Sequence, residues 1–299
     1  MTIKRRRVGR SGHGYSLDGE RVPGVTTVLQ KTVPKPALTY WAARMAAEYA
    51  LDHWDQLVAA EPSERYKALS TAHDTKRDAA AQRGTEVHRL AAQLADDQTV
   101  PVPDELAGHV EAYRDWLDRF EVAPVEGGSE LVVASRALRY CGTSDLIADL
   151  PDIFMDGELI SACRWLLELK TTSSGVWPES ALQATAYRRA DVFGVQMDPC
   201  GACDPDTRIL TGPRGGLSKC EACHPDKAGL AERPMDWLKI ARAGVVWIKS
   251  DTCELRPVDT GDDTWEFFSH LRWLYDRQDE MPGWIGSPAE AVRLLATTS

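Results

Sequence analysis

The sequence has no long hydrophobic run. Its longest apolar stretches, such as residues 243–248, have the length of a β-strand, whereas a membrane-spanning helix needs roughly 18 apolar residues. The basic residues at positions 4–7 are followed by no apolar segment, and a secretory signal peptide would require one. We therefore expect a cytoplasmic protein that has no membrane partner.

Basic residues are fewer than acidic residues. The 299 residues include 35 Lys and Arg against 45 Asp and Glu, for a formal net charge of -10. This balance repels a phosphate backbone on average, so it excludes a protein that coats nucleic acid through bulk positive charge. An enzyme that holds nucleic acid transiently, through metal ions and a few local cations, remains compatible with it.

Cysteines are too few for a disulfide scaffold, since the chain contains seven. Four of them form two C-x-x-C pairs separated by residues 204–219, a spacing typical of tetrahedral structural zinc sites in a reducing compartment. The ligands predicted by this spacing are Cys200, Cys203, Cys220 and Cys223. His224 could take the place of Cys223.

The first part of the chain is predicted to be mainly helical. Residues 7–29 are rich in turn-forming residues and predict a small hairpin that ends in a strand at 25–29. Apolar residues then recur at helical spacing. The expected helices cover 37–57, 63–94 with an interruption near Gly84, and 104–120 with Asp104 as N-cap.

The pattern changes after residue 124 to short apolar or alternating segments, which are typical of strands. Strands are predicted over 130–140, 143–150 and 163–171 as a meander, then over 243–249 and 253–258, with helices over 178–193 and 262–278. We expect an α/β (α+β) fold with a mixed central sheet flanked by helices. Its N-terminal hairpin and helical region would span 1–124 and its core 125–299, with a zinc-ribbon-like insert at 198–227.

An acidic pair and a lysine suggest a catalytic site. Side chains alternate along a strand, so Glu168 and Lys170 share one face of the predicted strand 163–171. Asp145 lies on the preceding strand and would approach Glu168 if the strands are neighbours. Two carboxylates can hold Mg²⁺, and a nearby lysine can stabilise charge on a phosphate. The alternatives are an exposed Glu–Lys pair of little energetic weight, and Asp149 in the place of Asp145.

Several short motifs occur in order around these residues. They are Pro-Gly-Val-Thr-Thr-Val-Leu at 23–29 after His13, Tyr15 and Asp-Gly at 18–19, Arg-Gly-Thr-Glu-Val-His at 83–88, Gly-Thr-Ser-Asp at 142–145, Glu-Leu-Lys at 168–170, and Gln183 with Tyr187. Together they resemble the PD-(D/E)xK nuclease superfamily, in its branch of RecB-like and phage recombination exonucleases. Ser144 departs from the pattern, because family members often have an apolar residue there.

The resemblance implies a restriction-endonuclease-like core and specific residue roles. The implied ligands of Mg²⁺ or Mn²⁺ are the side chains of His88, Asp145 and Glu168 and the carbonyl of Leu169. Lys170 would be the catalytic lysine. Gln183 and Tyr187 would lie on one helix face that meets the DNA near the scissile phosphate and contributes to catalysis. The alternatives are that His88 is an ordinary surface or core histidine and that this helix face only packs on the sheet. Glu86 could join a second metal ion.

The function implied by this resemblance is that of a metal-dependent DNA exonuclease. It would hydrolyse phosphodiester bonds of linear duplex or single-stranded DNA in recombination, replication or repair. The chain would be encoded by a phage or prophage and work in the bacterial host cytoplasm, with an annealing protein or helicase as a possible partner. The alternative is a non-catalytic or partner-dependent DNA-binding protein that docks through its zinc ribbon.

Within the cysteine-rich insert, Arg208 and Arg214 belong to a locally basic segment of an acidic protein. We expect them to contact DNA through its phosphates. Some relatives in the resembled branch hold an iron–sulfur cluster, which takes one cysteine from before the nuclease core. This chain has no cysteine before Cys141, so zinc is favoured over an iron–sulfur cluster.

Overall fold

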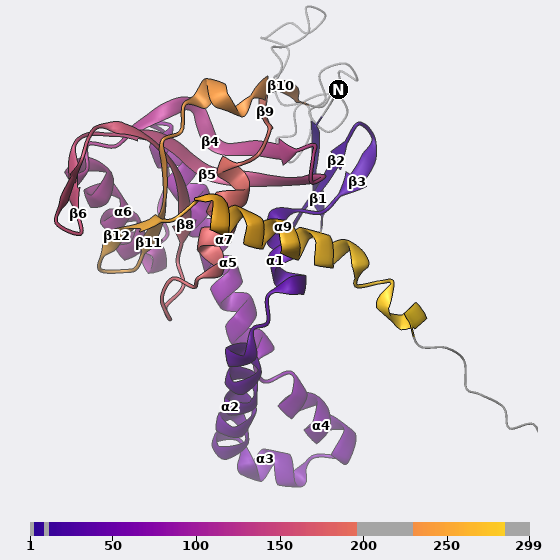
Figure 1. Ribbon diagram of the computed structural model, residues 1–299. Helices are drawn as coiled ribbons and strands as arrows, with labels where there is room; N and C mark the ends of the chain where they lie inside the picture. Colours follow the sequence, from indigo (N-terminus) through magenta and orange to yellow (C-terminus); the bar gives the residue numbers. More distant parts are fainter. Residues whose placement is uncertain (1–2, 9–11, 196–229, 285–299) are drawn as a thin grey trace, which may run out of the picture.

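A computed structural model describes residues 3–8, 12–195 and 230–284 of the chain (Figure 1). In this part the protein has a mixed α/β fold, in which helices flank a seven-stranded mixed sheet. The coarse fold class predicted from the sequence is therefore confirmed. The four cysteines of the predicted zinc site, together with Arg208 and Arg214, lie outside the described residues. None of the described helices combines the length and the apolar character needed to cross a membrane.

The central sheet places the predicted meander in its middle. In spatial order its strands are β10 (Ala231–Pro234), β9 (Val192–Val195), β4 (Ala123–Ser135), β5 (Tyr140–Leu150), β8 (Cys163–Lys170), β11 (Arg242–Ile248) and β12 (Cys253–Val258). Strands β8 and β11 are parallel, and the other neighbouring pairs of this sheet are antiparallel. The strands predicted at 163–171, 243–249 and 253–258 are observed with shifts of one residue or none. The strand predicted at 143–150 begins three residues earlier, at Tyr140.

Two helical layers bury the two faces of the sheet. One face packs against α5 (Asp74–Ala95) and α6 (Ala107–Arg119), and the other against α1 (Val25–Thr32), α7 (Glu179–Arg188) and α9 (Asp262–Arg277). Along β8, Leu167 and Leu169 face the first layer, while Leu166 faces the second. This alternation follows from the strand pleat, and it leaves Glu168 and Lys170 on the same face as α1 and α7.

Two smaller sheets complete the fold. The first contains β1 (Ile3–Val8), β2 (Gly12–Leu17) and β3 (Glu20–Val22), and the second contains β6 (Ile153–Met155) and β7 (Glu158–Ile160). Three short 3₁₀ segments in the described residues cover Asp104–Leu106, Met235–Leu238 and Met281–Trp284. The basic segment at positions 4–7 lies within β1, where Arg5 pairs with Glu130 of β4.

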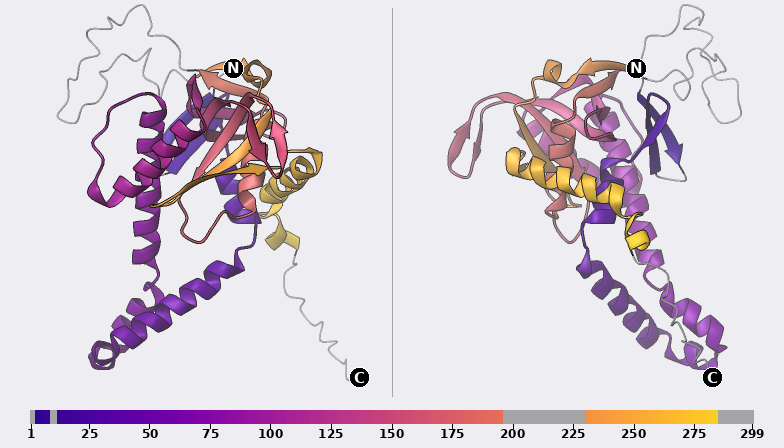
Figure 2. Two further views of the ribbon diagram at one scale, coloured as in Figure 1. Left: turned by 90° about the vertical axis from the view of Figure 1, so that its left-hand side faces the viewer. Right: turned by 45° about the vertical axis from the view of Figure 1, so that its right-hand side comes forward.

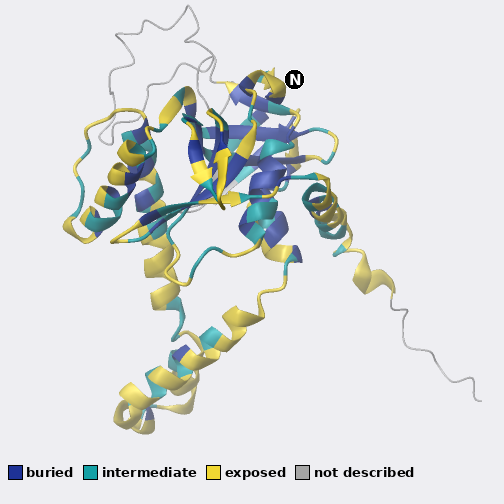
Figure 3. Cartoon of the chain, turned by 60° about the vertical axis from the view of Figure 1, so that its left-hand side comes forward, coloured by how far each residue is buried: buried dark blue, intermediate teal, exposed yellow. Residues whose placement is uncertain are grey.

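A helical arm extends away from the sheet. It consists of α2 (Pro36–Asp52), α3 (Trp54–Ala59) and α4 (Pro62–Ser70), which lie below the rest of the molecule in Figure 1 and project from it in both views of Figure 2. Within these three helices only Met45 and Leu57 are buried, and Figure 3 shows the arm as mostly exposed. The arm connects α1 to α5.

Three sequence-based predictions of secondary structure are wrong. Residues 25–29 form the first part of helix α1, because Val25, Val28, Leu29 and Thr32 fall on one helical face that packs against the core, and this packing overrides the strand preference of valine and threonine. Helix α5 runs through Gly84 without interruption. The helix predicted at 178–193 ends at Arg188, and β9 begins at Val192.

Other element boundaries also differ from the sequence-based expectation. The strand predicted at 130–140 is observed as β4 at Ala123–Ser135, and the helix predicted at 63–94 is divided at residues 71–73 into α4 and α5. The helix predicted at 37–57 is broken at His53 into α2 and α3. The helix predicted at 104–120 begins as a 3₁₀ turn, and Pro103 rather than Asp104 occupies the N-cap.

Candidate active site

Strand pairing brings the two predicted carboxylates together. The last paired residues of β5 and β8 at this end are Leu146 and Leu167, and one further step along the same register places Asp145 opposite Glu168. Beyond that pair the strands are joined by a side chain and not by a backbone–backbone hydrogen bond: the N–H of Leu169 donates to Oδ2 of Asp145 at 2.7 Å. Asp145 and Glu168 therefore face the same cavity from adjacent strands.

Glu168 is the centre of a buried hydrogen-bond network. Its Oε1 accepts from Nζ of Lys170 at 2.7 Å and from Nε2 of Gln183 at 2.6 Å. Gln183 also accepts from Lys170 Nζ through its own Oε1 at 3.0 Å, and its Nε2 lies 3.0 Å from the hydroxyl of Tyr187. The spacing of Gln183 and Tyr187 on one face of α7 thus links the helix to both charged groups of β8.

The second oxygen of Glu168 has no hydrogen-bond partner among the described residues, although the residue is only 2% exposed. Burial and the neighbouring Asp145 carboxylate raise the pKa of Glu168 to about 7. A buried carboxylate oxygen with no donor is costly to the folded state. This arrangement is the one that a bound cation would relieve.

Asp145 and Lys170 keep their charged forms. Burial alone would raise the pKa of Asp145, but His88, Lys170 and the Leu169 N–H outweigh it and hold that pKa below its ordinary value. For Lys170, burial lowers the pKa, but Glu168 and Asp145 more than offset this effect and raise it. Lys170 is therefore protonated at neutral pH.

Helix α5 places His88 next to Asp145, which follows it by 57 residues in the sequence. The Nδ1 of His88 lies 3.2 Å from Oδ1 of Asp145. Burial lowers the pKa of His88, but the Asp145 carboxylate outweighs burial and raises it. Helix α5 passes close to the end of β8 at Gly84, where a Cβ would lie 3.1 Å from Oγ1 of Thr171.

A glycine on β5 makes room for the aromatic ring of α7. A Cβ added to Gly142 would lie 2.2 Å from Cε1 of Tyr187, so the ring occupies the space of the missing side chain. Tyr187 is 2% exposed. The glycine of the Gly-Thr-Ser-Asp motif is thus required by packing. It seats Tyr187 over the strand that carries Asp145.

These residues line one cavity of about 800 Å³. Its wall includes all six side chains that the sequence motifs select: His88, Asp145, Glu168, Lys170, Gln183 and Tyr187. Tyr15 and Thr143, whose oxygens lie 2.9 Å apart, also line it. Thr26, Thr27 and Gln30 also line it, and the sequence-based reasoning gave them no role. Residues 25–29 were predicted to be a strand, so the exposed face of helix α1 could not be derived.

The carboxylates fit a divalent cation only in part as they stand. Among the described residues no three His, Cys, Asp or Glu side chains already form a complete ligand cluster. The Nδ1 of His88 is engaged with Asp145, and Oε1 of Glu168 is engaged with Lys170 and Gln183. The unpartnered Oε2 of Glu168, beside the mostly buried carboxylate of Asp145, nevertheless supplies the hard oxygen donors that Mg²⁺ and Mn²⁺ prefer.

We expect Mg²⁺ to stabilise the folded protein through Glu168. A ligand at 100 times its dissociation constant adds about 2.7 kcal/mol to the free energy of unfolding, which corresponds to an increase in melting temperature of roughly 5–11 °C for a chain of this size. The increase should be lost in Glu168→Gln. Melting followed by circular dichroism with Mg²⁺ or EDTA measures it.

Asp149→Asn is the matched control for that substitution, because Asp149 lies on β5, the strand next to the one that carries Glu168, but outside the cavity. It should keep the Mg²⁺-dependent increase. An equal increase in the unsubstituted protein and in Glu168→Gln would show that the cation does not bind at this carboxylate.

Two residues that the sequence left as alternatives are not brought to the cavity centre. Asp149 forms a double hydrogen bond with Arg164 at 2.8 and 2.9 Å, four residues along β5 from Asp145. Glu86 pairs with Arg89 of the same helix, and Arg89 lines the cavity whereas Glu86 does not. The tertiary structure therefore selects Asp145 over Asp149 as the neighbour of Glu168.

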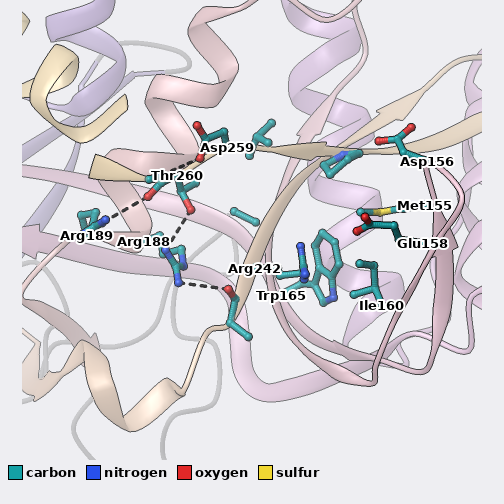
Figure 4. Close-up of a pocket in the computed structure, with 15 residues that line it drawn as sticks. Met155, Asp156, Glu158, Ile160, Trp165, Arg188, Arg189, Arg242, Asp259 and Thr260 are labelled. Atoms are coloured by element: carbon teal, nitrogen blue, oxygen red, sulfur yellow. Dashed lines mark hydrogen bonds between the residues drawn. The ribbon is translucent and has the colours of Figure 1, made fainter. Parts of the chain in front are cut away.

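A second cavity, of about 520 Å³, lies at the other end of β8 and is lined by arginines (Figure 4). Two of its three arginines are already partnered: Arg188 donates to Thr260 and to the carbonyl of Ala241, and Arg189 donates to Asp262. The acidic side chains of its lining are exposed. This cavity therefore has no buried acidic pair of the kind found beside Lys170.

Comparison with known proteins finds no family model that matches the chain and no curated relative with significant similarity.

Proposed function

We propose that the protein is a metal-dependent deoxyribonuclease of the PD-(D/E)xK type, acting as an exonuclease on linear DNA in phage or prophage recombination, replication or repair. The observation that carries the proposal is the convergence of Asp145, Glu168 and Lys170 in one cavity, where Glu168 Oε2 has no partner among the described residues. Structural sites rarely leave a buried carboxylate oxygen without a donor. Perturbed carboxylates in a cavity are typical of catalytic sites.

The proposed roles follow from charge and position. Asp145 and Glu168 would hold Mg²⁺ or Mn²⁺, with His88 and the Leu169 carbonyl as further ligands. A divalent cation bound there would polarise the phosphate and lower the pKa of a water molecule. Lys170 keeps its proton and would place a positive charge beside the phosphate as negative charge builds up on it.

Gln183 and Tyr187 would contribute by orientation. Gln183 contacts Glu168 and Lys170 at once, so it limits the positions that the lysine ammonium can take. Tyr187 lies within hydrogen-bond distance of the Gln183 amide and packs on Gly142. A charged group held by surrounding contacts needs little reorganisation during reaction.

The test is a nuclease assay on end-labelled linear duplex, single-stranded DNA and a closed circle, each with Mg²⁺, Mn²⁺ or EDTA. The proposal expects loss of the linear substrates with the divalent cations and none with EDTA, while the circle is spared. Position of the label then reports the polarity of cleavage. Cleavage of the circle would indicate an endonuclease, and cleavage in EDTA would contradict the metal-dependent mechanism.

For the cysteine-rich insert we propose a structural zinc site at Cys200, Cys203, Cys220 and Cys223, supported by their spacing. We expect Cys203→Ser to lower the zinc content, measured by elemental analysis, from one ion per chain to a small fraction of that. Loss of a structural zinc removes folding energy from its segment, so limited proteolysis between 196 and 229 should accelerate. Cys163→Ser, which changes a half-buried free thiol, should leave zinc content unaltered. Iron in place of zinc would indicate the iron–sulfur alternative.

A partner-dependent nuclease is the second candidate, and the helical arm favours it. The helices α2–α4 bury only two side chains, Met45 and Leu57. Six of their large apolar side chains are more than half exposed: Leu38, Tyr40, Leu51, Trp54, Val58 and Tyr66. Exposed apolar groups at this density are typical of interaction surfaces. Under this alternative the isolated chain would be silent in the nuclease assay and an annealing protein or helicase would restore cleavage.

A further inference from the structure

A charged aromatic patch borders the cavity lined by Glu168 and Lys170, which we call the catalytic cavity, on the side of β11 and β12. Trp247 of β11 is the register partner of Lys170 on β8, and Glu254 of β12 is the register partner of Trp247. Residues in register on adjacent strands share one face of a sheet and lie about 5 Å apart. Trp247 is therefore the immediate neighbour of the catalytic lysine, one strand nearer to the sheet edge.

Two cations surround the indole ring of Trp247. The Nζ of Lys249 lies 4.5 Å from the ring centroid, and the guanidinium carbon of Arg256 lies 4.8 Å from it. Glu254 holds both cations, at 3.4 Å from Lys249 and 2.8 Å from Arg256. We call these four residues the Trp247 patch. Its formal charge is positive, because one carboxylate faces two cations.

The charged side chains of the patch are accessible. Arg256 is 49% exposed, Glu254 39% and Lys249 32%. Strand β12 is the last strand of the sheet on this side, as Figure 1 shows. A chain that leaves the cavity past Lys170 toward this edge would therefore meet the Trp247 patch first.

The indole also ties the patch to the segment that follows Lys170. Its Nε1 donates to the carbonyl of Thr172 at 2.8 Å. This bond sets the position of the first residues after the catalytic lysine relative to β11. The patch is therefore tied to the segment that directly follows Lys170 of the cavity wall.

From this placement we infer that the Trp247 patch binds the sugar–phosphate backbone of the DNA strand next to the scissile phosphate. Lys249 and Arg256 contact phosphates, and the ring edge of Trp247 packs against sugar or base, which is the combination found on single-strand binding surfaces. Glu254 competes with the phosphates for the two cations, so it limits the affinity. The inference rests on the proposed nuclease function for the identity of the ligand.

The test measures binding of a fluorescein-labelled single strand in EDTA, where no metal-dependent cleavage occurs, over a series of salt concentrations. Lys249→Ala/Arg256→Ala should weaken binding severalfold and reduce the salt slope by about 0.7 per removed cation. Glu254→Gln should strengthen binding, because the cations lose their competing carboxylate. Hydrolysis of bis(4-nitrophenyl) phosphate, which has no neighbouring phosphate to bind, should be unaltered in both variants relative to the unsubstituted protein.

Arg277→Ala is a matched control. Arg277, the last residue of α9, lies 4.8 Å from the ring centroid of Trp273 and pairs at 3.5 Å with Glu280, which follows the helix. None of these three residues lines the cavity that holds Lys170. Arg277 reproduces the Arg–Trp–Glu arrangement of the patch, and its removal should leave the affinity and the salt slope unchanged. Melting curves verify that all variants fold.

The binding data decide the inference separately from the proposed function. An unchanged affinity and salt slope in Lys249→Ala/Arg256→Ala, or no binding of DNA by the unsubstituted protein, would overturn the inference. A protein that cleaves no substrate but loses affinity in this variant would contradict the proposed catalysis while supporting the Trp247 patch as a DNA-binding surface.

Discussion

Lys170→Ala is expected to reduce DNA cleavage by about 10²–10³-fold or more while the protein stays folded. Removal of one preorganised group that stabilises transition-state charge has this effect in other enzymes. The fold should persist because Glu168 keeps its bond from Gln183 at 2.6 Å after the lysine is gone. Initial rates on end-labelled linear DNA with Mg²⁺ measure the loss, and circular dichroism measures the fold.

Two further variants make the interpretation of that loss specific. Lys170→Arg keeps the positive charge but changes its shape and reach, so it should recover only part of the rate. Lys76→Ala removes an exposed lysine of α5 whose partner is Glu48, and it should leave the rate unchanged. Full activity in Lys170→Ala, or a protein that no longer folds, would contradict the assigned role.

Gly142→Ala is expected to destabilise the protein by about 3 kcal/mol, at the upper end of the cost of overpacking a core. The new Cβ would lie 2.2 Å from Cε1 of Tyr187, and that ring is buried. A loss of this size lowers the melting temperature by roughly 6–12 °C for a chain of this length. Activity should fall as well, because a displaced Tyr187 moves Gln183 away from Glu168.

A double-mutant cycle tests whether the clash with Tyr187 is the cause. In a Tyr187→Ala background the ring is absent, so Gly142→Ala should cost little further stability. Gly283→Ala is the control, since an added Cβ there would meet no atom within 4 Å, and it should leave the melting temperature unchanged. Additive losses in the cycle would indicate that Gly142 is required for another reason.

Particular residues show why part of the site could be predicted. Glu168 and Lys170 are two apart in an apolar strand, and the period of a strand places them on one face whatever the strand packs against. Gln183 and Tyr187 are four apart in a helix, so they also share a face. These relations depend on local geometry only, and the structure contains both.

Other parts of the site could not be predicted, because they depend on contacts between distant segments. Asp145 and Asp149 share a strand face, and the choice between them is made by the register of β5 against β8. The parallel pairing of β11 with β8, which brings Trp247 to Lys170, has no local signal. Residues 25–29 were expected to form a strand, and their packing against the core makes them a helix.

By itself the sequence determined the α/β class, the principal central strands, the acidic character of the chain and the residues that carry the proposed chemistry. Periodicity and residue type are sufficient for these properties, since each follows from neighbours a few positions apart. Only the tertiary structure decided that Asp145 is the carboxylate beside Glu168, that His88 contacts Asp145, and that the ring of Tyr187 packs against Gly142. Those outcomes depend on register, on helix placement and on close packing between residues 20 to 60 positions apart, where local preferences carry no information.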